Sequence, residues 1–279
     1  MNTNGLLIAM YAVAVLVEIG LPVTLAILMV RKGKIGWAVI LTGVLTFIAS
    51  QVVHIPLLQV PALLQKLGLP ISAPTSWPTW AYALFLGLMA GFCEETARLV
   101  GFKVLKSKAS SYKSGLALGI GHGGVESVII GFSVLGSLIA ALVYTANPSL
   151  MGAASPDQAN MALAQLQGIL TNPWHLPLAG AVERVTAVSC HLFMSVLVWQ
   201  TVSRGKVWGY WAAVLYHVVL DGTAVVLSTL GLSAWEMEAC LLPFLAFSLV
   251  MIWVFWKKEK ASMPELPTAD TGSVEAPAA

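Results

Sequence analysis

The sequence predicts an all-α membrane protein, a helix bundle with about seven transmembrane spans. Its mean hydropathy is +0.82 and only 10% of its 279 residues are charged, whereas a soluble domain has about 25%. Apolar runs recur along the chain, each near the roughly 20 residues that a helix needs to cross a bilayer. We therefore expect a multi-pass protein of the cell membrane, surrounded by lipid, with no nucleic-acid partner and with its oligomeric state left open.

The apolar runs define the seven spans in order, at residues 5–30, 35–58, 78–103, 114–145, 177–202, 207–230 and 236–256. The fourth is long enough to break near Gly131 or Gly136, which would allow an eighth. A short interfacial helix is expected over 158–170. Residues 1–260 form one transmembrane domain, with the motif-bearing core at about 78–230, and 261–279 form a cytoplasmic tail whose Pro, Ala, Thr and Glu content predicts disorder.

The basic residues predict the orientation of the spans. Twelve of the fifteen fall in alternate loops, in the first, third and fifth loops and after the last span, while the opposite loops hold only Lys66. Cytoplasmic loops are enriched in Lys and Arg. This pattern places the N-terminus outside and the C-terminus in the cytoplasm, and it favours an odd number of spans.

Four of the spans carry ionisable side chains at related positions. Residues at i and i+4 share a helix face, and a charge at the centre of a membrane helix costs roughly 2.5–3.5 kcal/mol or more. Counted from the nearest basic loop, the four sets lie at similar depths in the inner half of the bilayer, which predicts one polar site inside the membrane. The sets are Glu94, Glu95 and Arg98; His122 and Glu126; Glu183, Arg184 and His191; and His217 and Asp221.

Small residues predict how two of these spans meet. Gly87 and Gly91 precede the glutamates, and Gly115, Gly119 and Gly123 surround His122. Because glycines at this spacing let helix backbones approach closely, we expect the third and fourth spans to pack together. We also expect Arg98 to pair with Glu94 or Glu95, and Arg184 with Glu183 or a neighbouring helix. His54 and His175 are interpreted as interfacial or packing residues, Glu18 as a helix–helix contact or a rim residue of the cavity, and Glu236 and Glu238 as solvated.

These residue types favour hydrolysis. A glutamate can take a proton from water and return it to a leaving amine, and histidines can hold a water, bind zinc or donate to an oxyanion. The soluble-metalloprotease signature H-E-x-x-H is absent. A set of packing hydrogen bonds between helices is the structural alternative.

The motif combination resembles the YhfC family of intramembrane metalloproteases, itself similar to a branch of the type II CAAX-prenyl-protease and bacteriocin-processing superfamily. The residues that carry the resemblance are Gly91-Phe-Cys-Glu-Glu-Thr-Ala-Arg98, Gly119-Ile-Gly-His-Gly-Gly-Val-Glu126, Glu183-Arg184 with His191, and His217-x-x-x-Asp221. Relative to the superfamily pattern, Arg98 comes one residue early, Leu118 replaces a Phe, and Asp221 replaces an Asn. The resemblance implies that the first glutamate and first histidine activate water and that the later histidine polarises the scissile carbonyl.

We therefore expect an intramembrane peptidase, of metalloprotease or glutamic type, acting on a membrane-associated peptide or protein. Glu94 is the expected base, His122 the water-holding group and His217 the transition-state stabiliser, while Glu95 and Arg98 orient the site. Glu126, Glu183, Arg184, His191 and Asp221 support it. A zinc site would use His122, His191 and His217, with Glu126 or Asp221 beside them; a glutamic mechanism needs no cofactor. The alternatives are a scaffold or chaperone for membrane proteins and a proton-coupled transporter.

Overall fold

Helices are the only regular secondary structure in the described part of the chain. The computed structural model describes residues 5–150, 152 and 155–262, and no strand occurs among them. The all-α class predicted from the sequence is confirmed. The predicted disordered tail falls at residues 263–279 outside the described residues, while residue 261 still belongs to the last helix.

Seven long helices correspond to the seven predicted spans. They are α1 (Gly5–Arg31), α2 (Trp37–Leu58), α4 (Thr79–Leu105), α5 (Tyr112–Ala146), α7 (Leu176–Arg204), α8 (Trp208–Ser228) and α9 (Ala234–Ala261). The shorter helices are α3 (Val60–Lys66) and α6 (Pro156–Thr171), and α6 occupies the place of the expected interfacial helix. Because α5 continues unbroken past Gly131 and Gly136, the fourth span is not divided in two.

Six of these segments are both long enough and apolar enough to cross a membrane. They are α1, the continuous stretch Trp37–Lys66, α5, α7, α8 and α9. The remaining helix, α4, has 27 residues and is therefore about 40 Å long at roughly 1.5 Å per residue, but it carries Glu94, Glu95, Arg98 and Lys103. It packs against α2, α7 and α8, which enclose its first three charged residues. The chain is a multi-pass membrane bundle, and its orientation stays a prediction.

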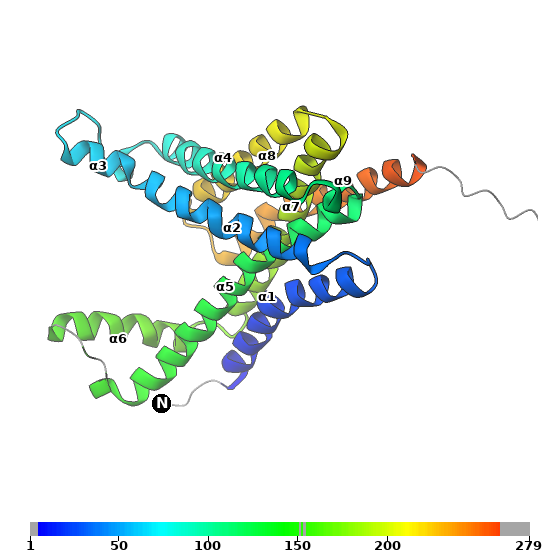
Figure 1. The fold of residues 1–279 in the computed structure, drawn as a ribbon. Helices are drawn as coiled ribbons and strands as arrows, with labels where there is room; N and C mark the ends of the chain where they lie inside the picture. Colours follow the sequence, from blue (N-terminus) through cyan, green and yellow to red (C-terminus); the bar gives the residue numbers. More distant parts are fainter. Residues whose placement is uncertain (1–4, 151, 153–154, 263–279) are drawn as a thin grey trace, which may run out of the picture.

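Helix α7 is the centre of the bundle. It contacts α1, α4, α5, α8 and α9. In its most apolar stretch of 18 residues, 67% of the residues are buried, compared with 17% in the corresponding stretches of α1, α5 and α9. In Figure 1, α2, α4 and α8 lie together in the upper part of the view, while α1 and α5 run side by side toward the lower left, where α6 follows α5. Polar residues on α7 are thus surrounded by protein on most sides.

The turn between α7 and α8 aligns two of the site helices. Gly205 ends α7 with a φ of 66°, a left-handed conformation that glycine adopts without steric cost, and α8 begins at Trp208. The two helices then run side by side in opposite directions. His191 and His217 face each other across this pair, with ring centroids 5.9 Å apart.

The glycine stripes pack against helices other than those expected. A Cβ added to Gly87 would lie 2.7 Å from the Val218 carbonyl oxygen of α8, and one added to Gly123 would lie 2.6 Å from the His191 Cβ of α7. The stripes therefore join α4 to α8 and α5 to α7, and the expectation that they join α4 to α5 is wrong. A row of small residues marks a face where a backbone comes close, but any helix can supply that backbone.

Helix α2 brings the glutamates of α4 and the histidine of α5 together. A Cβ on Gly43 would lie 2.2 Å from the Leu118 carbonyl oxygen, and one on Gly121 would lie 2.0 Å from that of Ile40, so α2 and α5 touch backbone to backbone. On the other side of α2, the methyl group of Thr46 lies 2.5 Å from where a Cβ of residue 101 on α4 would sit. Helix α2 is thus in close contact with both site helices.

Candidate active site

Glu94 is held at the wall of a buried cavity by three neighbouring side chains. Its Oε2 lies 3.1 Å from His122 Nε2 and 3.6 Å from an Arg98 nitrogen, and the Gln51 amide donates to its Oε1 at 3.1 Å. The residue is 6% exposed. Glu94, on α4, thus meets groups from α2 and α5 as well as its own helix.

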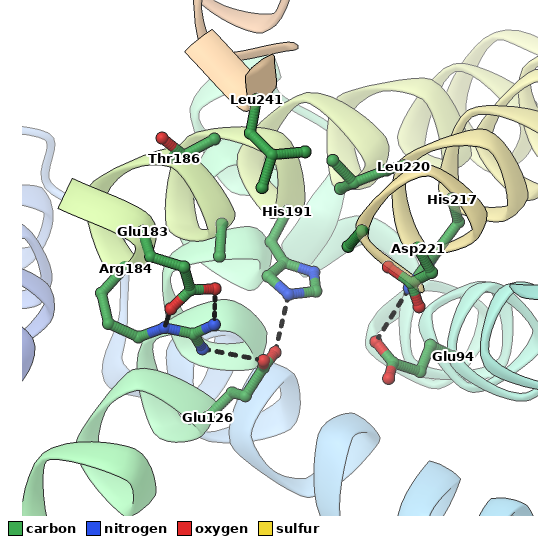
Figure 2. Close-up of a pocket in the computed structure, with 12 residues that line it drawn as sticks. Glu94, Glu126, Glu183, Arg184, Thr186, His191, His217, Leu220, Asp221 and Leu241 are labelled. Carbon is green, nitrogen blue, oxygen red and sulfur yellow. Dashed lines mark hydrogen bonds and ion pairs between the residues drawn. The ribbon is translucent and has the colours of Figure 1, made fainter. Parts of the chain in front are cut away.

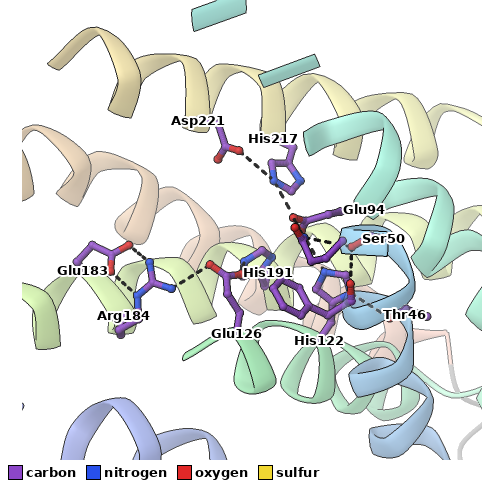
Figure 3. A network of polar contacts seen from close by, with 12 residues as sticks. Thr46, Ser50, Glu94, His122, Glu126, Glu183, Arg184, His191, His217 and Asp221 are labelled. Atoms are coloured by element: carbon purple, nitrogen blue, oxygen red, sulfur yellow. Dashed lines mark hydrogen bonds and ion pairs between the residues drawn. The ribbon is translucent and has the colours of Figure 1, made fainter. Parts of the chain in front are cut away.

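His122 is completely buried and is fixed on both ring nitrogens. Its Nδ1 lies 2.9 Å from Thr46 Oγ1, while its Nε2 faces Glu94 (Figure 3). Phe47 packs edge-on against the imidazole, with centroids 5.3 Å apart. The ring therefore has one nitrogen turned toward the α2 backbone region and the other toward the carboxylate.

Glu95, unlike Glu94, does not line the cavity and forms a fully buried ion pair. Arg98 donates to its Oε1, and His217 Nδ1 lies 2.8 Å from the same oxygen. The other nitrogen of His217 lies 3.9 Å from Glu94 Oε2 and 3.4 Å from Asp221 Oδ2. His217 is therefore anchored by Glu95 and directs its Nε2 toward Glu94 and Asp221.

A second group of charges continues from His191. Arg98 donates to His191 Nδ1, and the Nε2 of His191 lies 2.7 Å from Glu126. Arg184 then donates to Glu126 Oε1 at 2.9 Å and to both carboxylate oxygens of Glu183. The expected partners of both arginines are confirmed. Because Arg98 links His191 to Glu94 and Glu95, the four predicted motifs form one network across α4, α5, α7 and α8. Figure 3 shows its other charged members.

The network borders a cavity of about 130 Å³ (Figure 2). A cavity of this size is large enough to hold several water molecules. The side chains of Asp221 and Glu183 are the most exposed of the charged groups here, at 36% and 32%. The cavity is lined by Glu94, Glu126, Glu183, Arg184, Thr186, Ala187, His191, His217, Leu220, Asp221, Ala224 and Leu241.

Sequence reasoning did not identify the contribution of α2. Thr46 and Gln51 contact His122 and Glu94 directly, yet neither belongs to a charged motif. The available signal was a polar stripe, Thr46, Ser50 and Gln51, within an otherwise apolar span. Hydroxyl and amide residues are common in membrane helices as packing contacts, so such a stripe does not by itself identify a site.

The residues outside the site are mostly where we expected them. His175 accepts a hydrogen bond from the Trp235 indole at the surface, and Glu236 caps the start of α9 through Ser233. Glu238 is only 8% exposed, so its interpretation as a solvated residue is wrong. It lies one turn into α9, on the face turned toward the bundle.

The donor types present fit a catalytic zinc site. Glu94, His122 and His191 bring one ligand atom each to within 4.8 Å of one another, and all three are buried. Two histidines, one glutamate and an open position form a known catalytic arrangement for zinc. In the part of the chain that the structure describes, His217 is not a member of this group. The ligand set therefore contains Glu94 in place of the third histidine predicted from the sequence. His191 bonds through both nitrogens here, so a metal would replace Arg98 or Glu126 on one of them.

The fold and the site together define a class of protein. Long apolar helices form the outer surface. Carboxylates, histidines and arginines from four helices meet in their interior, where α2 adds Thr46 and Gln51. The chain is a multi-pass membrane protein with an internal polar centre whose groups are suited to acid–base or metal chemistry.

Comparison with known proteins identifies the family. The chain belongs to the family described as YhfC intramembrane metalloprotease, whose model matches residues 13–242. It is also 26% identical over 212 residues to the uncharacterized membrane protein YhfC of Bacillus subtilis (strain 168), covering 74% of this chain and 79% of that protein. No solved structure matches.

Proposed function

We propose that this protein is an intramembrane peptidase in which Glu94 and His122 activate the water that attacks a peptide bond of a membrane-associated substrate. The observation that carries the proposal is the contact of 3.1 Å between Glu94 Oε2 and His122 Nε2 at the wall of a buried cavity. The family description supports the same class of reaction.

Glu94 is placed to act as general base. The Gln51 amide occupies its Oε1, so Oε2 is the oxygen that takes the proton from water and later delivers it to the leaving amine. The lone pair of His122 Nε2 holds the same water by accepting its second proton in a hydrogen bond. Burial limits competing water here, because Glu94 and His122 are each at least nine-tenths buried.

His217 is placed to stabilise the developing oxyanion. Its Nδ1 is bonded to Glu95, and in the protonated ring its Nε2 donates toward the cavity near Glu94 and Asp221. A donor preorganised in a water-poor site contributes strongly to catalysis. Glu95 and Arg98 orient this ring and His191, and therefore act as positioning residues.

A zinc ion held by Glu94, His122 and His191 would supply Lewis-acid polarisation of the water and the scissile carbonyl. In either form the same residues line the cavity, and Asp221, the most exposed of their carboxylates, is available to hold a proton or an amide of the substrate.

The proposal is tested by comparing membrane peptides in cells that make the wild-type protein or Glu94→Gln, followed by cleavage assays on the substrate so found. Glu94→Gln and His122→Ala should abolish cleavage. His217→Ala should lower it by about 10²–10³, the scale of one lost oxyanion donor. Glu236→Gln, the same substitution at an exposed residue, is the matched control and should keep full activity.

Two outcomes would contradict this proposal. Full activity of Glu94→Gln on a real substrate would remove Glu94 as the base. If the peptides are identical in both strains but the abundance of particular membrane proteins changes, the scaffold alternative would be favoured.

A further inference from the structure

Thr46 of α2 lies outside every charged motif. Besides its contact with His122, it makes a second contact, with the backbone of its own helix, and this contact decides how His122 is protonated. Its Oγ1 lies 2.7 Å from the carbonyl oxygen of Gly43 as well as 2.9 Å from His122 Nδ1. It is 6% exposed, and His122 is fully buried. Both contacts therefore have to be satisfied within the protein.

A threonine hydroxyl has one proton to donate. The Gly43 carbonyl oxygen can only accept, so the hydroxyl donates its hydrogen to that oxygen in the 2.7 Å contact. The hydroxyl oxygen then has only lone pairs to offer His122, and Nδ1 must carry the hydrogen. In the neutral ring this leaves Nε2 unprotonated. Because two lone pairs cannot bond each other, its 3.1 Å contact with Glu94 Oε2 needs a hydrogen from the carboxyl group or, when Glu94 is ionised, a water that donates to both atoms.

We infer that Thr46 is a positioning residue that fixes His122 as the Nδ1–H tautomer and keeps the Nε2 lone pair directed at Glu94. That lone pair is what either mechanism requires, since a histidine that accepts from water or binds a metal uses an unprotonated nitrogen. A bond from the other ring nitrogen to a protein oxygen is the usual way in which such a tautomer is set.

The surrounding packing holds Thr46 in this position. The Gly43 carbonyl accepts the hydrogen bond from the hydroxyl. Gly43 is also where α2 and α5 are in backbone contact, because a Cβ there would lie 2.9 Å from the backbone nitrogen of His122. The Thr46 methyl group points to Gly101 of α4, and Phe47 packs against the imidazole edge-on. The hydroxyl therefore has little freedom to turn away.

The test reads the tautomer directly. Full-length protein labelled with ¹⁵N-histidine is reconstituted in lipid, and the His122 ring signals are assigned by their loss in His122→Gln. The wild type should show a protonated Nδ1 and an unprotonated Nε2. Thr46→Val, which keeps the shape but cannot accept a hydrogen bond, should lose this pattern and protonate Nε2, whereas Thr46→Ser should retain it.

Thr42→Val is the matched control. Thr42 lies one turn earlier on α2, its methyl group also faces Gly101, and its hydroxyl donates to the Ala38 carbonyl oxygen without contacting a histidine. It should leave the His122 signals unchanged. An unprotonated Nδ1 in the wild type, or an unaltered pattern in Thr46→Val, overturns the inference.

A kinetic measurement adds a second reading that rests on the proposed peptidase function. Replacing a residue that orients a catalytic histidine typically costs about 10–100-fold, so Thr46→Val should lower kcat by that factor with little change in KM, and Thr46→Ser should restore most of it. If no variant cleaves any substrate, the peptidase proposal fails, while the ring signals still decide the role of Thr46. Equal melting temperatures of Thr46→Val and Thr42→Val would separate positioning from stability.

Discussion

The two arginines inside the bundle are both paired, as buried charges require. Arg98 meets Glu95 and Glu94, and Arg184 meets Glu183 and Glu126. Removing one partner of such a pair leaves the other charge buried without compensation. Arg184 also bonds the carboxylate that contacts His191, so it links the stability of the bundle to the geometry of the site.

Arg184→Ala should therefore destabilise the protein by about 3–5 kcal/mol, because Glu126 and Glu183 lose their cation inside the bundle. The comparison is Arg204→Ala, which removes a more exposed pair with Glu259 and should cost about 0–1 kcal/mol. Thermal unfolding of both variants in detergent measures the difference. Wild-type stability together with lost activity would instead assign Arg184 to the reaction itself.

The zinc prediction now distinguishes between the three histidines. Because Glu94, His122 and His191 form the compact ligand group and His217 lies outside it, purified protein should contain about one zinc per chain. Alanine at His122 or His191 should remove it, whereas His217→Ala should retain it; elemental analysis measures this.

Asp221→Asn, at the cavity rim, is the control for the metal measurement and should retain zinc. Full peptidase activity in metal-free protein treated with strong chelators would rule out the metal form and support a glutamate-type mechanism.

At the scale of elements, the contact between α2 and α5 decides whether the site can form. No charged motif lies on α2, but its glycine and threonine positions bring His122 within reach of Glu94. Helices in a bilayer associate through close packing of small residues rather than through a hydrophobic effect between them. Loss of that fit should disturb the site even when every charged residue is intact.

Gly121→Ala should separate α2 from α5, since its Cβ would lie 2.0 Å from a backbone oxygen. We expect a lower melting temperature and a changed His122 tautomer, because Thr46 moves with α2. Gly136→Ala on the same helix has nothing within 4 Å and should be neutral or stabilising, as alanine favours a helix by about 1 kcal/mol over glycine. Equal behaviour of the two variants would contradict the packing explanation.

At the scale of the whole molecule, seven long helices place the basic loops at one end of the bundle. The ends of α1, α4, α7 and α9 and the starts of α2, α5 and α8 are on or beside the segments that carry the twelve basic residues. The single exception among the connecting segments is Lys66 at the end of α3. This arrangement is what the positive-inside rule requires of an odd number of spans.

Reporter fusions test the orientation. Fusions after residues 33, 109, 205 and 262 should report cytoplasmic positions, and those near 70, 155 and 233 external ones, because these sites alternate between the two ends of the long helices. A cytoplasmic signal near 155 would remove the seven-span arrangement and change the side from which the cavity is reached.

The sequence by itself determined the helical class, the positions of the seven long helices and most of the ionisable residues that gather inside the bundle. Hydropathy and charge are local properties, and a charge within an apolar run is recognisable without knowing its neighbours. Glu94, His122, His191 and His217 were therefore identifiable from their spacing and depth, and Arg98 and Arg184 implied their carboxylate partners because buried cations need them.

Only the tertiary structure decided which helices meet and which uncharged residues join the site. The glycines of α4 and α5 pack on α8 and α7, and α2 supplies Thr46 and Gln51. The compact ligand group in the structure contains Glu94 in place of His217, which the sequence had predicted. The physical reason is that a small-residue stripe or a lone hydroxyl has no partner preference of its own; its partner is set by how all the helices of the bundle pack at once.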